Sequence, residues 1–239
     1  MSDTYIFKRV EKKYRINKEQ KDALLSLIED NLSADEHGKS TVCSIYLDTP
    51  DSLLIRNSIS AKAYKEKLRL RSYGTPTDGD RVFLEIKKKY KGTVYKRRVA
   101  LSLAEAQRYI ETGIKPFDSQ IFREIDYAMK FYRMPRPAIL IACEREAFFD
   151  KTDQSLRVTI DSNIRYRTSA LSLSCGSDGT AILPHEEMIL EIKSGGAMPL
   201  WLAHALDACR IYPSSFSKYV TAYMRELTNK GGLKNACNI

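Results

Sequence analysis

The sequence predicts an α+β protein in which eight antiparallel strands close into a β-barrel with helices packed on the outside. Three observations lead to this expectation. Eight segments read as extended, and most alternate apolar with charged residues, as half-buried strands do. The central strands are separated by gaps too short for a parallel crossover, so neighbouring strands should run antiparallel. Amphipathic helical segments lie between the strands, and they would cover the outer, apolar face of the barrel.

The expected strands are separated by turn residues rather than by long linkers. A turn over 74–79 begins and ends with glycine, and Lys91-Gly92 separates the next two strands. The eight segments cover residues 6–16, 42–47, 64–72, 82–90, 94–101, 138–148, 156–161 and 188–194.

The expected helices begin at recognisable capping residues. Asn17 is followed three residues later by Gln20, and Ser102 by Glu105, which are capping-box spacings. Thr49-Pro50 starts a short helix carrying two leucines, since proline is favoured in the first turn. The other expected helices cover 118–132, 199–209 and 217–228, beside the two capped helices at 17–32 and 102–110.

Length and composition favour one domain spanning residues 1–239. No low-complexity linker or internal repeat divides the 239 residues, and 43% hydrophobic content can supply a core. The first residues lack the apolar region of a signal peptide, and no run of about 18 apolar residues occurs, so we expect a cytoplasmic location. The cysteines have no CxxC spacing and the histidines are scattered, which argues against a zinc site. The cysteines are Cys43, Cys143, Cys175, Cys209 and Cys237.

The net charge of +9 predicts an anionic partner. A nucleic acid, an acidic membrane surface and a phosphorylated small molecule all meet that description. The charge is concentrated, because residues 62–98 hold thirteen of the 39 lysines and arginines and only four acids.

Strand alternation places these cations on common faces. On the strand over 64–72, Arg69 and Arg71 lie on one face, and Leu68 and Leu70 lie on the other. The same alternation gives the following strands a charged face, and six or seven strands in all contribute one. The charged faces carry Glu11, Lys13 and Arg15; Lys65, Lys67, Arg69 and Arg71; Glu85, Lys87 and Lys89; Lys96 and Arg98; Arg157 and Asp161; Glu191 and Lys193.

These faces allow two interpretations. Each could simply be solvated while its apolar side packs on the core. If the sheet closes with the charged faces inward, like charges about 4 Å apart repel by roughly 4 kcal/mol at an effective dielectric near 20. A bound polyanion would relieve that repulsion, with each arginine acting as a bidentate phosphate ligand and each lysine as a point charge. We therefore expect the triphosphate of a nucleotide in the barrel, together with a divalent metal.

Three glutamates on the charged faces stand two residues from a lysine: Glu11, Glu85 and Glu191. They could compensate charge within a strand, or they could bind Mg²⁺ or Mn²⁺ that is shared with substrate phosphates. No GxxxxGK[ST] loop occurs, so side chains rather than a P-loop would hold a nucleotide triphosphate.

Eight short motifs follow one another along the chain. They are EKKY at 11–14, LRLRSYG at 68–74, FLEIK at 83–87, YKRR at 95–98, EREAF at 144–148, LRVTID at 156–161, LEIK at 190–193 and FSKY at 216–219. In this order the motifs resemble the VTC domain, a polyphosphate polymerase domain of the triphosphate tunnel metalloenzymes, or CYTH-like superfamily. The resemblance runs from Phe7 to about Glu226.

The resemblance implies a cationic tunnel that binds ATP and polyphosphate and synthesises inorganic polyphosphate from ATP with Mn²⁺ or Mg²⁺. It implies phosphate contacts by Lys13, Arg69, Arg71, Lys87, Lys96, Arg98, Arg145, Arg157, Lys193, Ser217 and Lys218. It implies metal binding by Glu191, with Glu11 and Glu85 as helpers. It implies catalytic roles for Lys13, Arg69, Arg71, Lys87, Arg145 and Glu191.

Two departures from the family pattern narrow this expectation. The wider superfamily opens with ExExK, whereas here Arg9 stands in place of the first acid, so two-metal hydrolysis is disfavoured. The membrane segments of the eukaryotic complex are missing, so translocation of a product would need a separate membrane-protein partner at the inner face of a membrane.

Three other functions remain open at this point. The tunnel could be a triphosphatase with water as the nucleophile, or a polyphosphate or nucleotide sensor without turnover. RNA binding is disfavoured, because Tyr64, Tyr90 and Tyr95 lie on the strand face opposite the key cations, where they cannot stack bases beside them.

Overall fold

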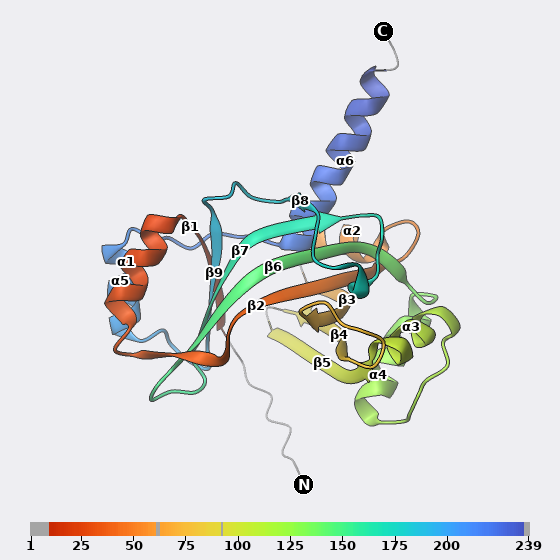
Figure 1. Cartoon of the computed structure of the whole chain (residues 1–239), viewed down its shortest axis with the longest axis horizontal. Coiled ribbons are helices and arrows are strands. Elements are labelled where there is room, and N and C mark those ends of the chain that lie inside the picture. Colours follow the sequence, from red (N-terminus) through yellow and green to blue (C-terminus); the bar gives the residue numbers. More distant parts are fainter. Residues whose placement is uncertain (1–9, 61–62, 92, 237–239) are drawn as a thin grey trace. The chain divides into compact units, whose positions relative to one another are not determined.

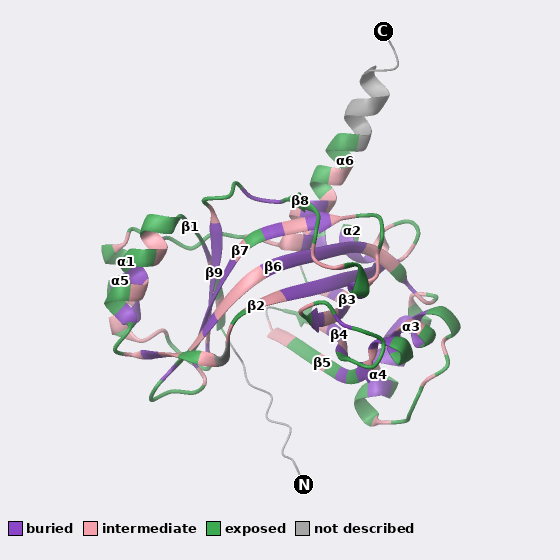
Figure 2. Ribbon diagram, in the orientation of Figure 1, coloured by how far each residue is buried: buried purple, intermediate pink, exposed green. Residues whose placement is uncertain are grey.

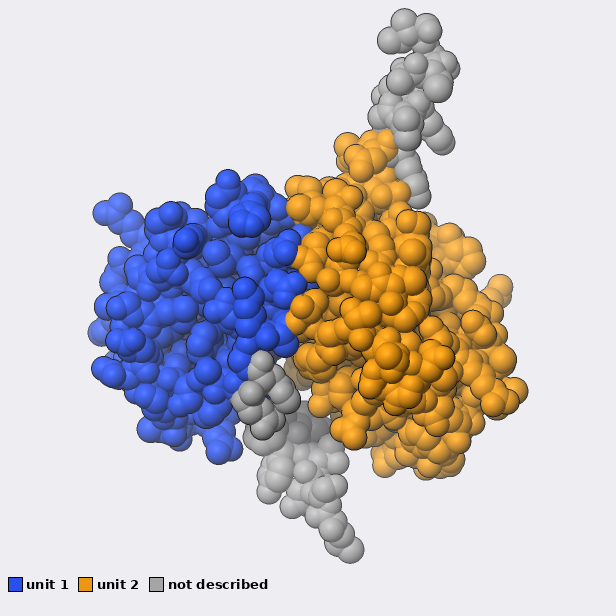
Figure 3. All heavy atoms as spheres, in the orientation of Figure 1, with its two compact units in different colours: residues 1–40, 143–164, 183–216 blue, residues 41–142, 165–182, 217–239 orange. Residues whose placement is uncertain are grey.

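The chain forms two compact units, each built from three segments of the sequence (Figure 3). Unit 1 comprises Met1–Ser40, Cys143–Ile164 and Leu183–Phe216, and unit 2 comprises Thr41–Ala142, Arg165–Ile182 and Ser217–Ile239. A computed structural model describes residues 10–60, 63–91 and 93–236, with side chains for all of these except 36–37 and 230–236. Arg9, Gly92 and Cys237, like the start of the first expected strand, lie outside the described residues. That the two units act as one domain stays a prediction.

The strands form one antiparallel sheet, and they differ in length (Figure 1). They are β1 (Val10–Ile16), β2 (Leu32–Asp48), β3 (Tyr64–Tyr73), β4 (Arg81–Tyr90), β5 (Thr93–Ser102), β6 (Arg136–Asp150), β7 (Arg157–Arg167), β8 (Thr180–Ala181) and β9 (Met188–Ser194). The hydrogen-bonded order is β1-β9-β7-β6-β2-β3-β4-β5, and the short β8 pairs with β7.

The predicted closed barrel of eight strands needs correction. The described sheet has nine strands and is not closed, because its path ends at β1 on one side and at β5 on the other. Side-chain alternation predicts which residues share a face, but closure depends on a ladder of backbone hydrogen bonds between the two end strands, and that ladder leaves no trace in the alternation.

All six predicted helices are present, with changes at their ends. They are α1 (Lys18–Ile28), α2 (Leu53–Ser60), α3 (Leu103–Thr112), α4 (Gln120–Phe131), α5 (Leu200–Ala208) and α6 (Lys218–Ala236), and a 3₁₀ turn η1 covers Leu173–Cys175. The first helix stops at Ile28, and Leu32 already belongs to β2. That strand starts ten residues earlier than expected, because its polar first part lacks the apolar alternation by which a strand is recognised in the sequence.

The capping predictions are confirmed. The Asn17 side chain accepts a hydrogen bond from the Gln20 amide at 2.8 Å, and the Gln20 side chain accepts one from the Asn17 amide at 3.2 Å. The Ser102 and Glu105 pair makes the same reciprocal bonds at the start of α3. Each box satisfies backbone donors that an open helix end would leave unpaired.

The core of unit 1 lies between the strand run β1-β9-β7 and the helices α1 and α5, which lie side by side in Figure 1. The apolar side chains at alternate positions of the strands pack against the apolar side chains on one face of each helix. This core contains Tyr14, Ile16, Leu24, Ile28, Val158, Ile160, Leu190, Ile192, Leu202 and Leu206. Since the helices cover this side of the strands, the charged residues at the intervening positions lie on the other side.

Unit 2 repeats this arrangement with β2-β3-β4-β5, whose apolar face packs against α3 and α4 (Figure 2). The core includes Leu68, Leu70, Leu84, Ile86, Val99, Leu101, Tyr109, Phe122, Ile125 and Met129. Confirming the predicted alternation, Leu68 and Leu70 are buried, while Arg69 between them and Arg71 after them are partly exposed. Among the described residues, no helix combines the length and the apolar character needed to cross a membrane.

Candidate functional site

In unit 2, three adjacent strands align their cations in rows across the sheet. Lys67 of β3 pairs in register with Lys87 of β4, which pairs with Lys96 of β5. Two residues further along, Arg69 faces Glu85, and Glu85 faces Arg98. We call this set the cationic face, and it consists of Lys67, Arg69, Arg71, Lys87, Lys96 and Arg98 with Glu85 among them. Six cations thus surround one carboxylate on the side of the sheet opposite the core.

Glu85 anchors this face. Its side chain is 1% exposed, Arg69 Nε donates to Oε2 at 2.6 Å, and Lys96 Nζ lies 2.7 Å from Oε1. Burial raises the pKa of Glu85, but Arg69 and Lys96 outweigh it and bring the pKa down to about 2. Burial lowers the pKa of Lys96 to about 8, although Glu85 opposes the change. Because both Glu85 oxygens already meet cations, metal binding by Glu85 would require Arg69 or Lys96 to move, and its role as a metal ligand stays a prediction.

Tyr46 of β2 borders the cationic face and was not predicted. It lies opposite Arg69 in the β2–β3 register, and Arg69 Nη1 donates to its hydroxyl at 3.5 Å. Burial would raise the pKa of Tyr46, but the charges of Arg69 and Lys67 outweigh burial and lower it to about 8. A phenol that ionises so easily reports a strongly positive potential. Alternation along β2 could have indicated Tyr46, but its partner strand could not be known from the sequence.

The start of α6 meets the same face. Lys67 Nζ donates to Ser217 Oγ at 3.1 Å, and the same oxygen accepts a longer hydrogen bond of 3.4 Å from the Val220 amide. Ser217 therefore caps α6. Tyr219 stacks on Tyr46 at 4.3 Å between ring centroids. The positive end of the helix dipole consequently adds to the potential at the cationic face.

The other predicted cations of unit 2 each contact a different part of the protein. Arg71 Nε donates to Ser44 Oγ at 3.1 Å, and the Arg98 guanidinium lies 4.4 Å from the centre of the Phe83 ring. Lys218 is half-buried at the first position of α6. Each guanidinium carries five N–H donors, so it can bind ligand oxygens in addition to its partner in the protein.

The remaining predicted residues gather in unit 1 as a mixed-charge cluster. It consists of Glu11, Lys13, Arg145, Arg157, Asp161, Glu191 and Lys193. In the β1–β9 register Glu11 faces Lys193, and Lys13 faces Glu191. Lys193 Nζ lies 2.5 Å from Glu191 Oε1, whereas Lys13 Nζ lies 3.5 Å from Glu11 and 3.9 Å from Glu191. Burial lowers the pKa of Lys193 even though Glu191 opposes the change.

Arg145 is held by a carboxylate that the sequence did not single out as its partner. Its Nε and Nη2 donate to the two oxygens of Asp161 at 2.6 and 2.7 Å, and Asp161 is fully buried. Burial lowers the pKa of Arg145, but Asp161 more than offsets it and the pKa is raised. The more exposed Arg157 pairs with Asp35 instead.

We expect Asp161→Asn to destabilise the protein by about 3 kcal/mol or more, because it leaves a mostly buried guanidinium without its counter-charge. The free energy of unfolding, measured by urea denaturation, checks this. Arg157→Ala is the matched control, since its half-exposed pair with Asp35 should contribute less than about 1 kcal/mol. Equal losses in the two variants would show that the Arg145–Asp161 pair is not a buried anchor.

Two carboxylates of the mixed-charge cluster suit a hard divalent cation. Glu11 and Glu191 both contact Lys13, so their oxygens approach a common point that already holds positive charge. Mg²⁺ and Mn²⁺ are commonly bound by one or two carboxylates with substrate phosphates completing the shell. Within the described part of the chain, no three His, Cys, Asp or Glu residues cluster at metal-binding distances. The residues therefore fit a metal site that needs oxygens from the substrate.

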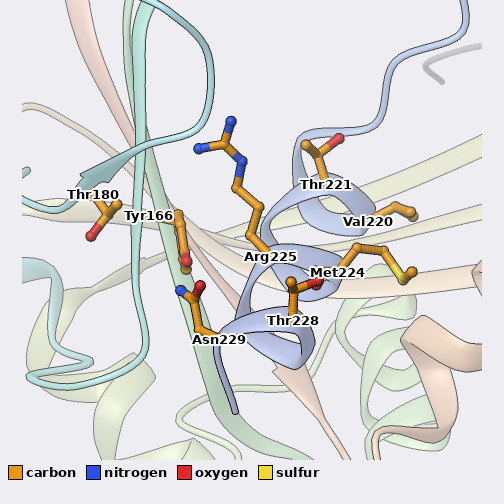
Figure 4. Close-up of a pocket in the computed structure, with 8 residues that line it drawn as sticks. All are labelled: Tyr166, Thr180, Val220, Thr221, Met224, Arg225, Thr228 and Asn229. Carbon is orange, nitrogen blue, oxygen red and sulfur yellow. The ribbon is translucent and has the colours of Figure 1, made fainter. Parts of the chain in front are cut away.

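A cavity of about 610 Å³ lies elsewhere in unit 2, between α6 and the strands β7 and β8 (Figure 4). It is lined by Tyr166, Thr180, Val220, Thr221, Met224, Arg225, Thr228 and Asn229. Arg225 Nη1 donates to the Ala181 carbonyl at 2.7 Å. None of the predicted site residues lines this cavity, so it is separate from the cationic face.

The fold and the rows of cations define the class of protein. A candidate adenylate cyclase from Bacillus halodurans matches with a TM-score of 0.54 at 14% identity, covering 88% of this chain and 95% of that one. A candidate adenylyl cyclase from Hippeastrum, with a dominant triphosphatase activity, matches with a TM-score of 0.53 at 13% identity, covering 88% and 93%. At 14% and 13% identity, these two matches show the fold class of the chain.

Within that class, the chain belongs to the VTC domain family, whose model matches residues 8–226. Subunit 4 of the vacuolar transporter chaperone complex is 27% identical over 225 residues in Trypanosoma cruzi and 27% over 222 residues in Trypanosoma brucei brucei. Each match covers 75% of this chain but only 27% or 28% of the relative. The chain thus spans about a quarter of the length of these relatives.

Proposed function

We propose that the protein binds the triphosphate of ATP and inorganic polyphosphate on its cationic side chains and transfers the γ-phosphate of ATP to a growing polyphosphate chain. The cationic face carries this proposal. Six aligned cations against one carboxylate, with a phenol whose pKa is lowered to about 8 beside them, support a ligand of high negative charge. Membership of the VTC domain family supports polyphosphate as the acceptor.

In the proposed reaction, a terminal oxygen of polyphosphate attacks the γ-phosphorus of ATP. The bond from that phosphorus to the β–γ bridging oxygen breaks, and ADP leaves. Arg71 and Arg98 would bind phosphate oxygens through their guanidinium N–H donors, and Lys87 would contribute a point charge. Such a face accelerates transfer mainly by alignment and charge neutralisation.

We further propose that Glu191 and Glu11 of unit 1 hold Mg²⁺ or Mn²⁺, with phosphate oxygens of the substrate as its other ligands. When bound, the metal neutralises negative charge on phosphate oxygens during transfer. Lys13 and Lys193 keep the two carboxylates in place before the substrate arrives. The product would pass to a separate membrane-protein partner, and the domain would work at the cytoplasmic side of that membrane.

Product analysis tests the proposal. The full chain is incubated with ATP and Mn²⁺, and the products are resolved. We expect ADP and long-chain polyphosphate. Free phosphate would identify a triphosphatase, the activity of the Hippeastrum protein that shares this fold. Unchanged ATP together with tight tripolyphosphate binding would identify a sensor.

Tripolyphosphate binding should weaken as the pH rises through about 8, the pKa of the Tyr46 phenol without ligand. A bound polyanion favours the neutral phenol and raises this pKa, so the complex holds the proton more tightly than the free protein does. By linkage, the affinity for tripolyphosphate then falls as the pH rises from the pKa of Tyr46 in the free protein toward its higher pKa in the complex. Isothermal titration calorimetry across this range measures the slope.

Tyr46→Phe is the control for this pH effect. It keeps the ring that stacks on Tyr219 and removes the ionisable hydroxyl. Titration of the ligand and of Lys96 is common to both proteins, so the variant should show a shallower but not flat pH dependence. An identical slope in the two proteins would mean that the Tyr46 hydroxyl does not respond to the ligand.

A further inference from the structure

Exposed aromatic side chains gather on the face of unit 2 opposite the cationic face. Tyr64 and Tyr90 are cross-strand partners next to Lys65 and Lys89, which lie on the other face of β3 and β4, and α4 adds Tyr127 and Phe131 one turn apart. Their exposed fractions are 43%, 47%, 68% and 66%, which is unusual for residues of this size. We call the aromatic patch the set Tyr64, Tyr90, Tyr95, Tyr127, Phe131 and Tyr132.

Contacts join the members of the aromatic patch into one surface. The ring centroids of Tyr64 and Tyr90 lie 6.4 Å apart. The ring centroid of Phe131 lies 6.3 Å from that of Tyr127 and 5.0 Å from that of Tyr132. The hydroxyls of Tyr64 and Tyr132 both donate to the carboxylate of Glu66, which links the strand group to the α4 group. Tyr95 lies opposite Lys88 in the β4–β5 register, on the same side of the sheet.

The charges around the aromatic patch complement an anionic partner. Its carboxylates are each engaged within unit 2: Glu66 by Lys88, Glu124 by Arg97, and Asp126 by Lys130. Two further cations stand at its ends. Lys91 lies over the Tyr90 ring at 5.4 Å, and the exposed Arg133 follows Tyr132 directly. Five cations against three carboxylates leave two positive charges, one over the Tyr90 ring and one next to Tyr132 in the chain.

We propose that the aromatic patch docks the protein on a membrane surface that contains anionic lipids. Tyrosine suits the membrane–water interface because its ring is apolar and its hydroxyl is polar, while phenylalanine inserts more deeply. Lysine and arginine beside the rings attract anionic headgroups. The arrangement is less suited to RNA, because Tyr127 and Phe131 already stack on one another at 24° between ring planes instead of offering separate platforms.

The docking surface lies on the opposite side of β3, β4 and β5 from Arg71, Lys87 and Arg98, which we propose to bind phosphate, so the two functions can be tested separately. The full chain is mixed with vesicles of phosphatidylcholine alone or with added phosphatidylserine, and vesicle flotation measures the bound fraction. We expect binding only with phosphatidylserine. Replacing both Tyr127 and Phe131 with Ser should weaken it about tenfold or more, since two exposed rings leave the interface.

Matched variants separate docking from a general loss of structure or charge. Leu200→Ser, at a 75% exposed position of unit 1, should bind vesicles like the unaltered protein. Circular dichroism of the Tyr127→Ser, Phe131→Ser double variant should remain unchanged, because both rings project from α4. Saturating tripolyphosphate should not displace the vesicles.

Displacement of the vesicles by tripolyphosphate would mean that lipids bind the cationic face. Loss of RNA binding rather than vesicle binding in the double variant would assign the aromatic patch to RNA. Either result, or unaltered vesicle binding by the double variant, overturns the proposal.

Discussion

Replacing Glu191 with Gln is expected to lower phosphoryl transfer on the order of a thousandfold, while the protein still binds tripolyphosphate. The substitution keeps the size of the side chain and removes its charge. A divalent metal supplies several kcal/mol of charge stabilisation during transfer, and about 1.4 kcal/mol corresponds to a factor of ten in rate. Single-turnover transfer from ATP and calorimetric titration of Mn²⁺ with a non-hydrolysable ATP analogue measure the two consequences.

Glu11→Gln is the matched control, because the same change is made on the neighbouring strand. Glu11 is more exposed than Glu191 and lies farther from a lysine, so we expect a smaller loss of rate. Urea unfolding separates chemistry from structure, since Lys193 is largely buried and loses its closest counter-charge in Glu191→Gln. If Glu191→Gln binds Mn²⁺ and the analogue as the unaltered protein does, Glu191 is not a metal ligand.

Strand faces could be predicted from the sequence because alternation is local information. Between Leu68 and Leu70, Arg69 has only one available side once the leucines are buried. The capping box at Asn17 was predictable for the same reason, since all of its atoms lie within four residues. The predicted cations Arg69, Lys87 and Lys96 accordingly lie on one face of β3, β4 and β5.

Partners from other strands could not be predicted, because register is set by packing and not by local pattern. Tyr46 contacts Arg69, which lies 23 residues away in the sequence, and Asp161 contacts Arg145, which lies 16 residues away. Shifting either strand by one residue would turn these side chains to the opposite face. The open ends of the sheet at β1 and β5 escaped prediction for the same reason, since alternation alone is equally compatible with an open and a closed sheet.

Replacing Arg71 with Ala is expected to reduce tripolyphosphate affinity about a hundredfold, since each charge-assisted hydrogen bond that it can make to phosphate contributes about 1.5–3 kcal/mol. Within the protein, Arg71 Nε donates a hydrogen bond of 3.1 Å to the Ser44 hydroxyl, and its charge also favours the ionised form of Glu85. Because Arg69 and Lys96 hold Glu85 directly, the free energy of unfolding should fall less in this variant than in Arg69→Ala. Calorimetric titration with tripolyphosphate and urea unfolding measure the two effects on the same variant.

Arg69→Ala provides the comparison that distinguishes a binding cation from an anchoring one. Arg69 holds Glu85, which is 1% exposed, so its removal should weaken binding and also destabilise the protein by about 3–5 kcal/mol. A folded Arg71→Ala variant that binds tripolyphosphate normally would mean that the ligand does not use the cationic face. A stable Arg69→Ala variant would mean instead that Lys96 alone can hold the Glu85 carboxylate, and the two outcomes separate an error in the proposed ligand site from an error in its internal support.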